Sequence, residues 1–212
     1  ELPLDGSRFE ALIPPVVPAP TFALRKKATL IFSLADYVRT GVMTELQATL
    51  IKTAVADRKN ILIAGGTGSG KTTLANAVLN EISFISPDHR IVIIEDVLEL
   101  QCSVKNAVFL RTSANIDQVS LLRATLRLRP DRIVVGEVRD KSALALLKAW
   151  NTGHPGGIGT VHANSTGAAL VRIGQLIQEA GVPAAPELIS EVRKASNFGL
   201  SKPSSKFGDG IN

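Results

Sequence analysis

The segment GGTGSGKT, residues 65–72, constrains the fold of this chain more than any other feature. An apolar run, ILIA, precedes it, and a helical stretch, TTLANAVLNEI, follows it. In the pattern G-x-x-x-x-G-K-[ST], the backbone N–H groups of a loop between a strand and a helix point at phosphate oxygens, and the helix N-terminus adds its positive dipole end. A glycine-rich turn without a ligand would not require Lys-Thr after its last glycine. The sequence therefore predicts a phosphate-binding loop.

Apolar runs and helical stretches alternate from residue 60 onward. The runs are ILIA, RIVIIE, RIVVG and IGTVHA, and the helical stretches begin near Lys71, Asp117, Ser142 and Thr166. Continuous apolar strands are typical of a parallel sheet whose two faces are both covered. We therefore predict an α/β fold over residues 60–180, with a mainly parallel sheet flanked by helices.

The segments before and after this region have other patterns. Residues 11–20 are rich in proline and predict an irregular extended segment, followed by a short edge strand over residues 22–27. Helices are predicted over residues 33–38 and 44–56, with Ser33 and Thr44 as N-caps. The apolar face of the second helix is predicted to carry Leu46, Leu50, Ile51 and Val55. The Ser-, Gly- and Lys-rich tail over residues 196–212 predicts a disordered or atypical end.

Composition excludes several classes of protein. The single cysteine, Cys102, removes a disulfide framework, and with three histidines it leaves no zinc-binding set, so we expect a reducing compartment. No apolar stretch has the length of a membrane span, and the first residues lack a signal-peptide pattern, which predicts a soluble intracellular protein. The formal net charge of +5 leaves nucleic acid, anionic lipid and phosphorylated ligands open as partners. Because the chain begins at Glu1, we expect a fragment.

The phosphate loop assigns a first set of site residues, with ATP and Mg²⁺ as the expected ligands. Lys71 would bridge the β- and γ-phosphates, and Thr72 would offer its hydroxyl to Mg²⁺. The other expected nucleotide-binding residues are Gly65, Gly66, Thr67, Gly68, Ser69, Gly70 and Thr73.

Acidic residues follow two of the apolar runs. Glu95 and Asp96 end the run at 90–95, and Glu137 follows Gly136 after the run at 132–136. Ligands of open α/β sheets gather at this edge, where a carboxylate can take a proton from an attacking water. Glu137 could hold the water shell of Mg²⁺, polarise the attacking water, or do both. The alternative is that Glu95, Asp96 and Glu99 form only a solvated turn.

One histidine and one arginine are further candidates. His162 ends the run IGTVHA and could sense the γ-phosphate or contact a neighbouring subunit, whereas His89 and His154 are interpreted as structural. Arg129 precedes Pro130 and could lie near phosphate charge. Arg123 and Arg127, four residues apart, are interpreted as a solvated helix face.

Four motifs in order, GGTGSGKTT, RIVIIEDVLEL, LLRATLRLRPDRIVVGEVRD and TGHPGGIGTVHANS, resemble those of the secretion-superfamily ATPases of type IV secretion, type II secretion and type IV pili. The residues of these motifs are most similar to those of the conjugative-transfer ATPases of the TrbB type, and the similarity covers roughly residues 8–190. The resemblance implies a RecA-like ATPase domain over residues 33–195, preceded by a remnant of an N-terminal domain over residues 1–32. It also implies a homohexamer, peripheral at the cytoplasmic face of the inner membrane, that works with membrane components of a secretion or conjugation apparatus and contacts DNA indirectly.

The resemblance also assigns roles to the motifs. Residues 65–72 match the Walker A motif, and Gly136 with Glu137 matches Walker B. Glu95 and Asp96 match the Asp box, whose Glu is the family's usual general-base candidate, and His162 matches the His box. Arg129 matches an arginine near the nucleotide. Arg8 and Arg25 resemble arginines of the N-terminal domain that approach the phosphates, across subunits.

The family continues past its last helix with an apolar strand and further helices, which this sequence lacks.

Other functions remain open. A pilus or type II secretion motor is disfavoured because the type II enzymes often carry a four-cysteine zinc insertion. A nucleic-acid-binding module would need aromatic stacking platforms, of which this chain offers few. A small-molecule kinase would need an acceptor pocket and a lid that the sequence does not identify.

Overall fold

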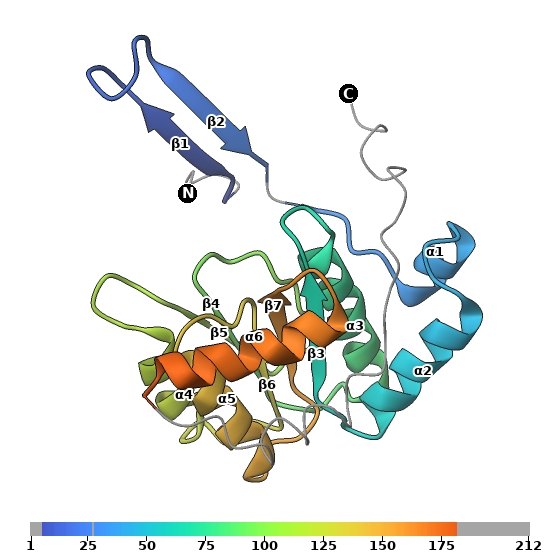
Figure 1. The fold of residues 1–212 in the computed structure, drawn as a ribbon. Helices are drawn as coiled ribbons and strands as arrows, with labels where there is room; N and C mark the ends of the chain where they lie inside the picture. Colours follow the sequence, from blue (N-terminus) through green and yellow to red (C-terminus); the bar gives the residue numbers. More distant parts are fainter. Residues whose placement is uncertain (1–5, 27, 182–212) are drawn as a thin grey trace. The chain divides into compact units, whose positions relative to one another are not determined.

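The computed structural model describes residues 6–26 and 28–181, and these fall into two compact units with a boundary between Ile31 and Phe32 (Figure 1). The predictions for residues 196–212, and for the end of the ATPase domain beyond residue 181, lie outside the described residues. Within the part of the chain that is described, no helix is both long enough and apolar enough to cross a membrane.

The first unit is a β-hairpin. Strand β1 (Arg8–Leu12) pairs antiparallel with β2 (Thr21–Arg25), and the proline-rich segment forms the connection. Arg8 and Arg25 are direct partners in the register, so their side chains share one face of the hairpin. Phe9 and Phe22 stack on the other face with ring centroids 5.8 Å apart. The sequence predicted β2 within a residue or two but missed β1.

The second unit contains a five-stranded sheet with the order β3-β7-β6-β4-β5, in which every described pair of neighbours is parallel. The strands are β3 (Ile61–Gly65), β4 (Ile91–Glu95), β5 (Ala107–Arg111), β6 (Arg132–Val135) and β7 (Ile158–His162). The helices are α1 (Leu34–Arg39), α2 (Glu45–Ala56), α3 (Lys71–Ile85), α4 (Gln118–Thr125), α5 (Ser142–Asn151) and α6 (Thr166–Glu179). The predicted parallel α/β sheet is therefore confirmed.

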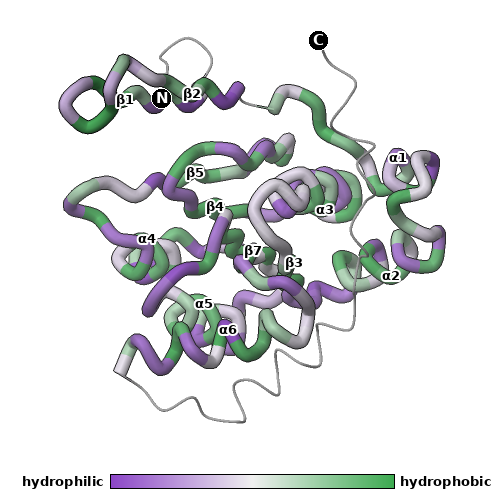
Figure 2. Tube along the Cα trace, turned by 45° about the horizontal axis from the view of Figure 1, so that its top comes forward, coloured by the Kyte–Doolittle hydropathy of each residue, from purple (hydrophilic) through white to green (hydrophobic). Residues whose placement is uncertain are grey.

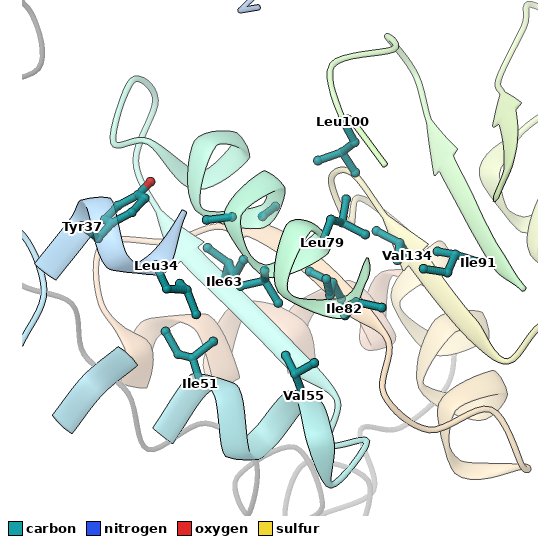
Figure 3. Packing of buried hydrophobic residues seen from close by; sticks show 14 of the residues in the cluster. Leu34, Tyr37, Ile51, Val55, Ile63, Leu79, Ile82, Ile91, Leu100 and Val134 are labelled. Carbon is teal, nitrogen blue, oxygen red and sulfur yellow. The ribbon is translucent and has the colours of Figure 1, made fainter. Parts of the chain in front are cut away.

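Alternate residues of each central strand face opposite layers. Ile63, Ile91, Ile93, Val134 and Ile158 pack with α1, α2 and α3 in one buried cluster, part of which is drawn in Figure 3. The second cluster joins α4, α5 and α6 to Ile94, Ile133, Val135 and Val161. Because both faces are covered, β4 and β6 are buried along their whole length, which explains their unbroken apolar sequences. Figure 2 shows the hydrophobic residues gathered along these central strands.

The helix starts were largely predictable from capping chemistry. Ser33 and Thr44 are the N-caps of α1 and α2, as predicted, and each also forms a capping box; Asp117 caps α4. The predicted apolar face of α2 was partly wrong, because Leu46 and Leu50 are 69% and 40% exposed. The buried stripe of α2 is instead Ala48, Ile51 and Val55, which follow helical spacing.

A buried guanidinium joins several elements at the amino edge of the sheet. Arg132, the first residue of β6, is 1% exposed and donates to the carbonyl oxygens of Gly156 and Val55, each at 3.0 Å. It also donates to Ser86 Oγ at 3.3 Å and, through Nε, to His89 Nδ1 at 3.1 Å. Val55 lies in the last turn of α2 and Ser86 caps the C-terminus of α3, so the negative helix ends favour this charge.

The chain's one tryptophan holds β6 and β7 together. Trp150 of α5 is 5% exposed, and its indole N–H donates to the Ile133 carbonyl at 3.3 Å. A Cβ on Gly157 would overlap the indole, and one on Gly159 would lie 3.3 Å from it. Gly157, just before β7, and Gly159, within β7, therefore leave the space that this large ring occupies.

His89 gives the stability of the fold a pH dependence. Burial, followed by the Arg132 charge, lowers the pKa of His89. Protonation of Nδ1 would also remove the acceptor of the Arg132 Nε–H group. In the unfolded chain the imidazole titrates near about 6.5. The unfolded state therefore binds more protons below that pH, and the stability supplied by neutral His89 is lost as the pH falls.

We expect the free energy of unfolding of His89→Gln, whose amide oxygen can still accept, to decline less than that of the wild type between pH 7 and pH 5. Parallel pH profiles in denaturant titrations would contradict this assignment.

Candidate functional site

The glycine-rich segment forms the turn between β3 and α3. Gly65 ends β3, and Lys71 begins α3. Gly68 and Gly70 adopt φ values of 70° and 86°, a backbone conformation in which a side chain would be strained. The ammonium group of Lys71 donates to the carbonyl oxygen of Gly66 at 2.8 Å. The loop therefore curls around the Lys71 side chain, as a phosphate-binding loop requires.

The start of α3 contacts the segment that follows β4. The Thr72 hydroxyl lies 3.3 Å from Glu99 Oε2, to which it donates. Asn76, one turn further along α3, accepts from the Gln101 N–H group at 2.9 Å and donates to the Glu99 carbonyl at 3.5 Å. Because Asn76 is buried, these bonds fix the segment at 99–101 against the helix. Glu99 is thus the carboxylate in contact with the phosphate loop.

Glu95 has a different position. It is 3% exposed, and its Oε1 atom accepts from the backbone N–H groups of Glu99 and Leu100, each at 3.0 Å. A Cβ on Gly136 would lie 2.8 Å from Glu95 Cγ, so the glycine that precedes Glu137 leaves room for the Glu95 side chain. Glu95 therefore shapes the turn that presents Glu99. The sequence suggested a solvated turn as the alternative for Glu99, and no pattern along the chain marks its contact with Thr72.

Three charged side chains form a cluster after β4 and β6, which are neighbours and parallel. Arg139 forms ion pairs with Glu137 Oε2 and, at 3.4 Å, with Asp96 Oδ2. Asp96 Oδ1 accepts from the Thr112 hydroxyl at 2.8 Å. The hydrogen bond to Glu137, together with the charges of Glu137 and Asp96, raises the pKa of the Arg139 guanidinium. The predicted acids Asp96 and Glu137 are thus brought together, and Arg139 joins them.

His162 lies beside the phosphate loop. It is the last residue of β7 and pairs with Gly65 in the parallel register, so its backbone adjoins the point where the loop begins. Its side chain is exposed. Thr67 is exposed, and Ser69 and Thr73 are half-buried around the same turn. The carboxyl edge of the sheet therefore gathers the loop, the acids and His162.

The predicted arginines lie elsewhere. Arg129 precedes β6 and has a φ of 52°. Its neighbours Leu128 and Asp131 bond to Arg90, which comes just before β4, so Arg129 lies at the amino edge of the sheet. The structure therefore does not bring Arg129 to the phosphate loop of its own chain. Arg8 and Arg25 belong to the hairpin unit, where they are brought together with each other.

The other two histidines have structural contacts. His154 Nδ1 lies 3.0 Å from the Pro130 carbonyl oxygen, and His89 bonds to Arg132. Both are half-buried, although the sequence suggested an exposed turn for His89.

Comparison with known proteins gives consistent results. The type II/IV secretion system protein family matches residues 7–194. The probable conjugal transfer protein TrbB of Sinorhizobium fredii is 58% identical over 192 residues, which are 91% of this chain and 59% of that protein. The conjugal transfer protein TrbB of Rhizobium radiobacter is 56% identical over 191 residues, 90% of this chain and 59% of that protein. This chain therefore spans about three fifths of the length of both relatives.

A solved structure supports the same assignment. The VirB11 ATPase from the Brucella suis type IV secretion system is similar with a TM-score of 0.63 and 27% identity, covering 91% of this chain and 64% of that one. This similarity confirms the predicted RecA-like fold. With the family match over residues 7–194 and the identity to two conjugal transfer proteins, it shows that the chain belongs to the type II/IV secretion system protein family.

Proposed function

We propose that this chain binds and hydrolyses ATP to power a conjugative type IV secretion machine. The observation that carries the proposal is the contact between Thr72, at the end of a Walker A loop, and the Glu99 carboxylate, 3.3 Å away at the carboxyl edge of the sheet. The similarity to two conjugal transfer proteins and to the ATPase of a type IV secretion system supports substrate transfer as the process that the hydrolysis drives. We propose pilus assembly as a second process driven by the same machine.

The chemistry of the loop suits a magnesium nucleotide. Lys71 would leave the Gly66 carbonyl to pair with the β- and γ-phosphates, and the loop N–H groups would hold the phosphate oxygens. Mg²⁺ takes oxygen ligands, and nucleotide sites supply one or two protein oxygens while phosphates and water supply the rest. The Thr72 hydroxyl, the Glu99 carboxylate and, through water, Glu137 fit that requirement.

The hydrolysis would be an in-line attack of water on the γ-phosphate, with positioning and charge stabilisation supplying most of the acceleration. Among the acids, Glu99 and Glu137 are half-buried and can meet that water, whereas Glu95 is 3% exposed and its Oε1 atom accepts from two backbone N–H groups. Glu95 would act through Glu99 as a positioning residue. His162 would contact the γ-phosphate or a neighbouring subunit.

The assembly is proposed to be a homohexamer that lies at the cytoplasmic side of the inner membrane and meets membrane components of the apparatus, with indirect contact to DNA. In such a ring, Arg8 and Arg25 of one subunit would approach the phosphates bound by the next. Their direct pairing across the hairpin supports a joint role, because one movement of the hairpin would carry both guanidinium groups. Arg129, at the amino edge, is not assigned a role at the phosphates.

Removal of the loop ammonium should abolish turnover. We expect Lys71→Ala to lower kcat by about 100-fold or more, because the charge that accumulates on the phosphates in the transition state loses its partner. Lys71→Arg should fail as well, because a forked guanidinium does not fit a loop shaped for a point charge. Lys52→Ala, at an exposed position of α2, is the matched control. Phosphate release at saturating ATP measures the effect, and near wild-type turnover in Lys71→Ala would remove the loop from the active site.

Three acid-to-amide variants separate the carboxylates. Glu99→Gln and Glu137→Gln should keep MgATP affinity within about threefold while turnover falls by about 100-fold, because they retain size and polarity but cannot accept a proton. If Glu137 holds the water shell of Mg²⁺, its variant should also weaken the Mg²⁺ dependence of binding.

Glu95→Gln should instead lower the melting temperature, since the substitution changes a buried side chain that accepts from two backbone N–H groups. Titration of nucleotide affinity against Mg²⁺, with Glu45→Gln of α2 as a control, distinguishes the three. Full turnover in Glu99→Gln together with inactive, stable Glu95→Gln would return the general-base role to Glu95.

Subunit mixing tests the arginines in trans. An Arg8→Ala, Arg25→Ala double variant and a Lys71→Ala variant should each be inactive alone, and mixing them should restore part of the activity. In mixed rings some interfaces pair an intact loop with intact arginines, as with an arginine supplied in trans elsewhere. Specific activity of the wild type should also rise with concentration. Concentration-independent activity with no rescue would mean that one chain contains the complete site.

A further inference from the structure

Arg139 pairs with acids that follow two different strands of the sheet. Its Nη1 atom lies 3.4 Å from Asp96 Oδ2, after β4, and its Nη2 atom donates to Glu137 Oε2, after β6. The guanidinium is planar, and its two ends point to different carboxylates, which a single ammonium group cannot reproduce. The cluster of Asp96, Glu137 and Arg139 lies at the same edge as the phosphate loop but contains none of its residues.

The backbone around this cluster is held by bonds from several elements. The carbonyl oxygen of Glu137 accepts from Gln118 Nε2 at 3.0 Å, and the carbonyl oxygen of Gly136 accepts from the Thr160 hydroxyl at 2.6 Å. The Ser142 hydroxyl donates to the carbonyl oxygen of Arg139. These bonds fix the backbone but not the side-chain conformation of Glu137. Without a further contact, its rotatable bonds would let the carboxylate occupy several positions. The ion pair with Arg139 selects one of them.

Asp96 gives Arg139 a fixed support. Its Oδ1 atom accepts from the Thr112 hydroxyl after β5, and the Thr112 N–H group donates to the Glu95 carbonyl oxygen. A continuous series of contacts therefore runs from the edge strand through Thr112 and Asp96 to Arg139 and ends on Glu137. The side chain of Arg139 is 60% exposed, so these ion pairs contribute little to the stability of the fold. They lie at the same edge of the sheet as the phosphate loop, which suggests a role in the chemistry of that edge.

We propose that Arg139 is a positioning residue for ATP hydrolysis, which holds the Glu137 carboxylate in one orientation and offsets the charge of Glu137 and Asp96 against an approaching triphosphate. The inference rests on the proposed function of this site. Arg139 acts through Glu137 and need not touch the nucleotide. Without it, Glu137 would sample orientations that do not serve the reaction, and the cluster would lose the positive charge that offsets its carboxylates.

Kinetics of Arg139→Gln and Arg139→Lys test the positioning role. We expect Arg139→Gln to lower kcat about tenfold or more while KM for MgATP changes less than about threefold, because bound nucleotide is kept but the acid is misplaced. Arg139→Lys should recover part of the lost kcat, since one ammonium can pair with one of the two acids. Arg172→Gln, which removes an arginine with a single 3.1 Å ion pair on α6, is the matched control and should leave kcat unchanged.

A double-mutant cycle with Glu137→Gln identifies the partner. If Arg139 acts through Glu137, then adding Arg139→Gln to Glu137→Gln should change kcat by less than about twofold. A kcat for Arg139→Gln within twofold of the wild type, a kcat for Arg139→Lys no higher than that of Arg139→Gln, or an additive cycle would each overturn the proposal. Lys71→Ala tests the ATPase assignment independently of the Arg139 variants. Failure of the ATPase assignment can therefore be distinguished from failure of the Arg139 assignment.

Nucleotide binding without Mg²⁺ gives a readout that is independent of turnover. Free ATP carries more negative charge than MgATP, so the loss of the Arg139 charge should weaken the binding of ATP in EDTA by about threefold or more, and that of MgATP by less. The melting temperature of the nucleotide-free protein should stay close to that of the wild type. An equal loss of affinity with and without Mg²⁺, accompanied by a lower melting temperature, would assign Arg139 a structural role instead.

Discussion

Parallel pairing of the strands is the constraint on which the site depends. Because β3, β7, β6 and β4 run in the same direction, the segments that follow them emerge at one edge of the sheet. The phosphate loop, His162, Glu137 and the turn that carries Glu99 come from four separate parts of the sequence and meet there for this reason alone. A reversed strand would remove its residue from the site without altering any local motif. The buried residues of β4 and β6, which hold the register, therefore position the chemistry as surely as the loop does.

Much of the fold could be predicted because its signals are local. The continuous apolar runs of the central strands, the N-caps Ser33, Thr44 and Asp117 and the loop before α3 each lie within a short window of sequence. β5 and β1 were missed because an edge strand pairs on one side and carries a mixed sequence, AVFLR in one case and RFEAL in the other. Leu46 and Leu50 were assigned to the buried face because apolar character alone cannot tell which of two overlapping stripes of a helix meets its neighbour.

The part of the site that lies within one segment of the sequence could be predicted. The roles of the individual acids could not, because tertiary packing determines which carboxylate faces the phosphate loop. Residues 65–72 form a loop from their own glycines, so the motif was sufficient. The acids after β4 looked equivalent in sequence, yet Glu95 turns inward into the space that Gly136 leaves, and Glu99 faces Thr72. No pattern along the chain could reveal that division, because the space for Glu95 is provided 41 positions later. Arg129 is close in sequence to Glu137 but precedes the strand that Glu137 follows, so within one chain it lies at the opposite edge of the sheet from the phosphate loop.

The place of Trp150 has an optical consequence. It is the only indole of the chain, it is 5% exposed, and it bonds to β6 while resting on the glycines of β7. β7 ends at His162, and β6 leads directly into Glu137. Any rearrangement of those strand ends that also shifts one strand against the other changes the surroundings of the ring and the length of its N–H hydrogen bond, and with them the wavelength and intensity of its emission. The chain thus carries an intrinsic fluorophore between the two strands that border its site, and no label is needed to follow them.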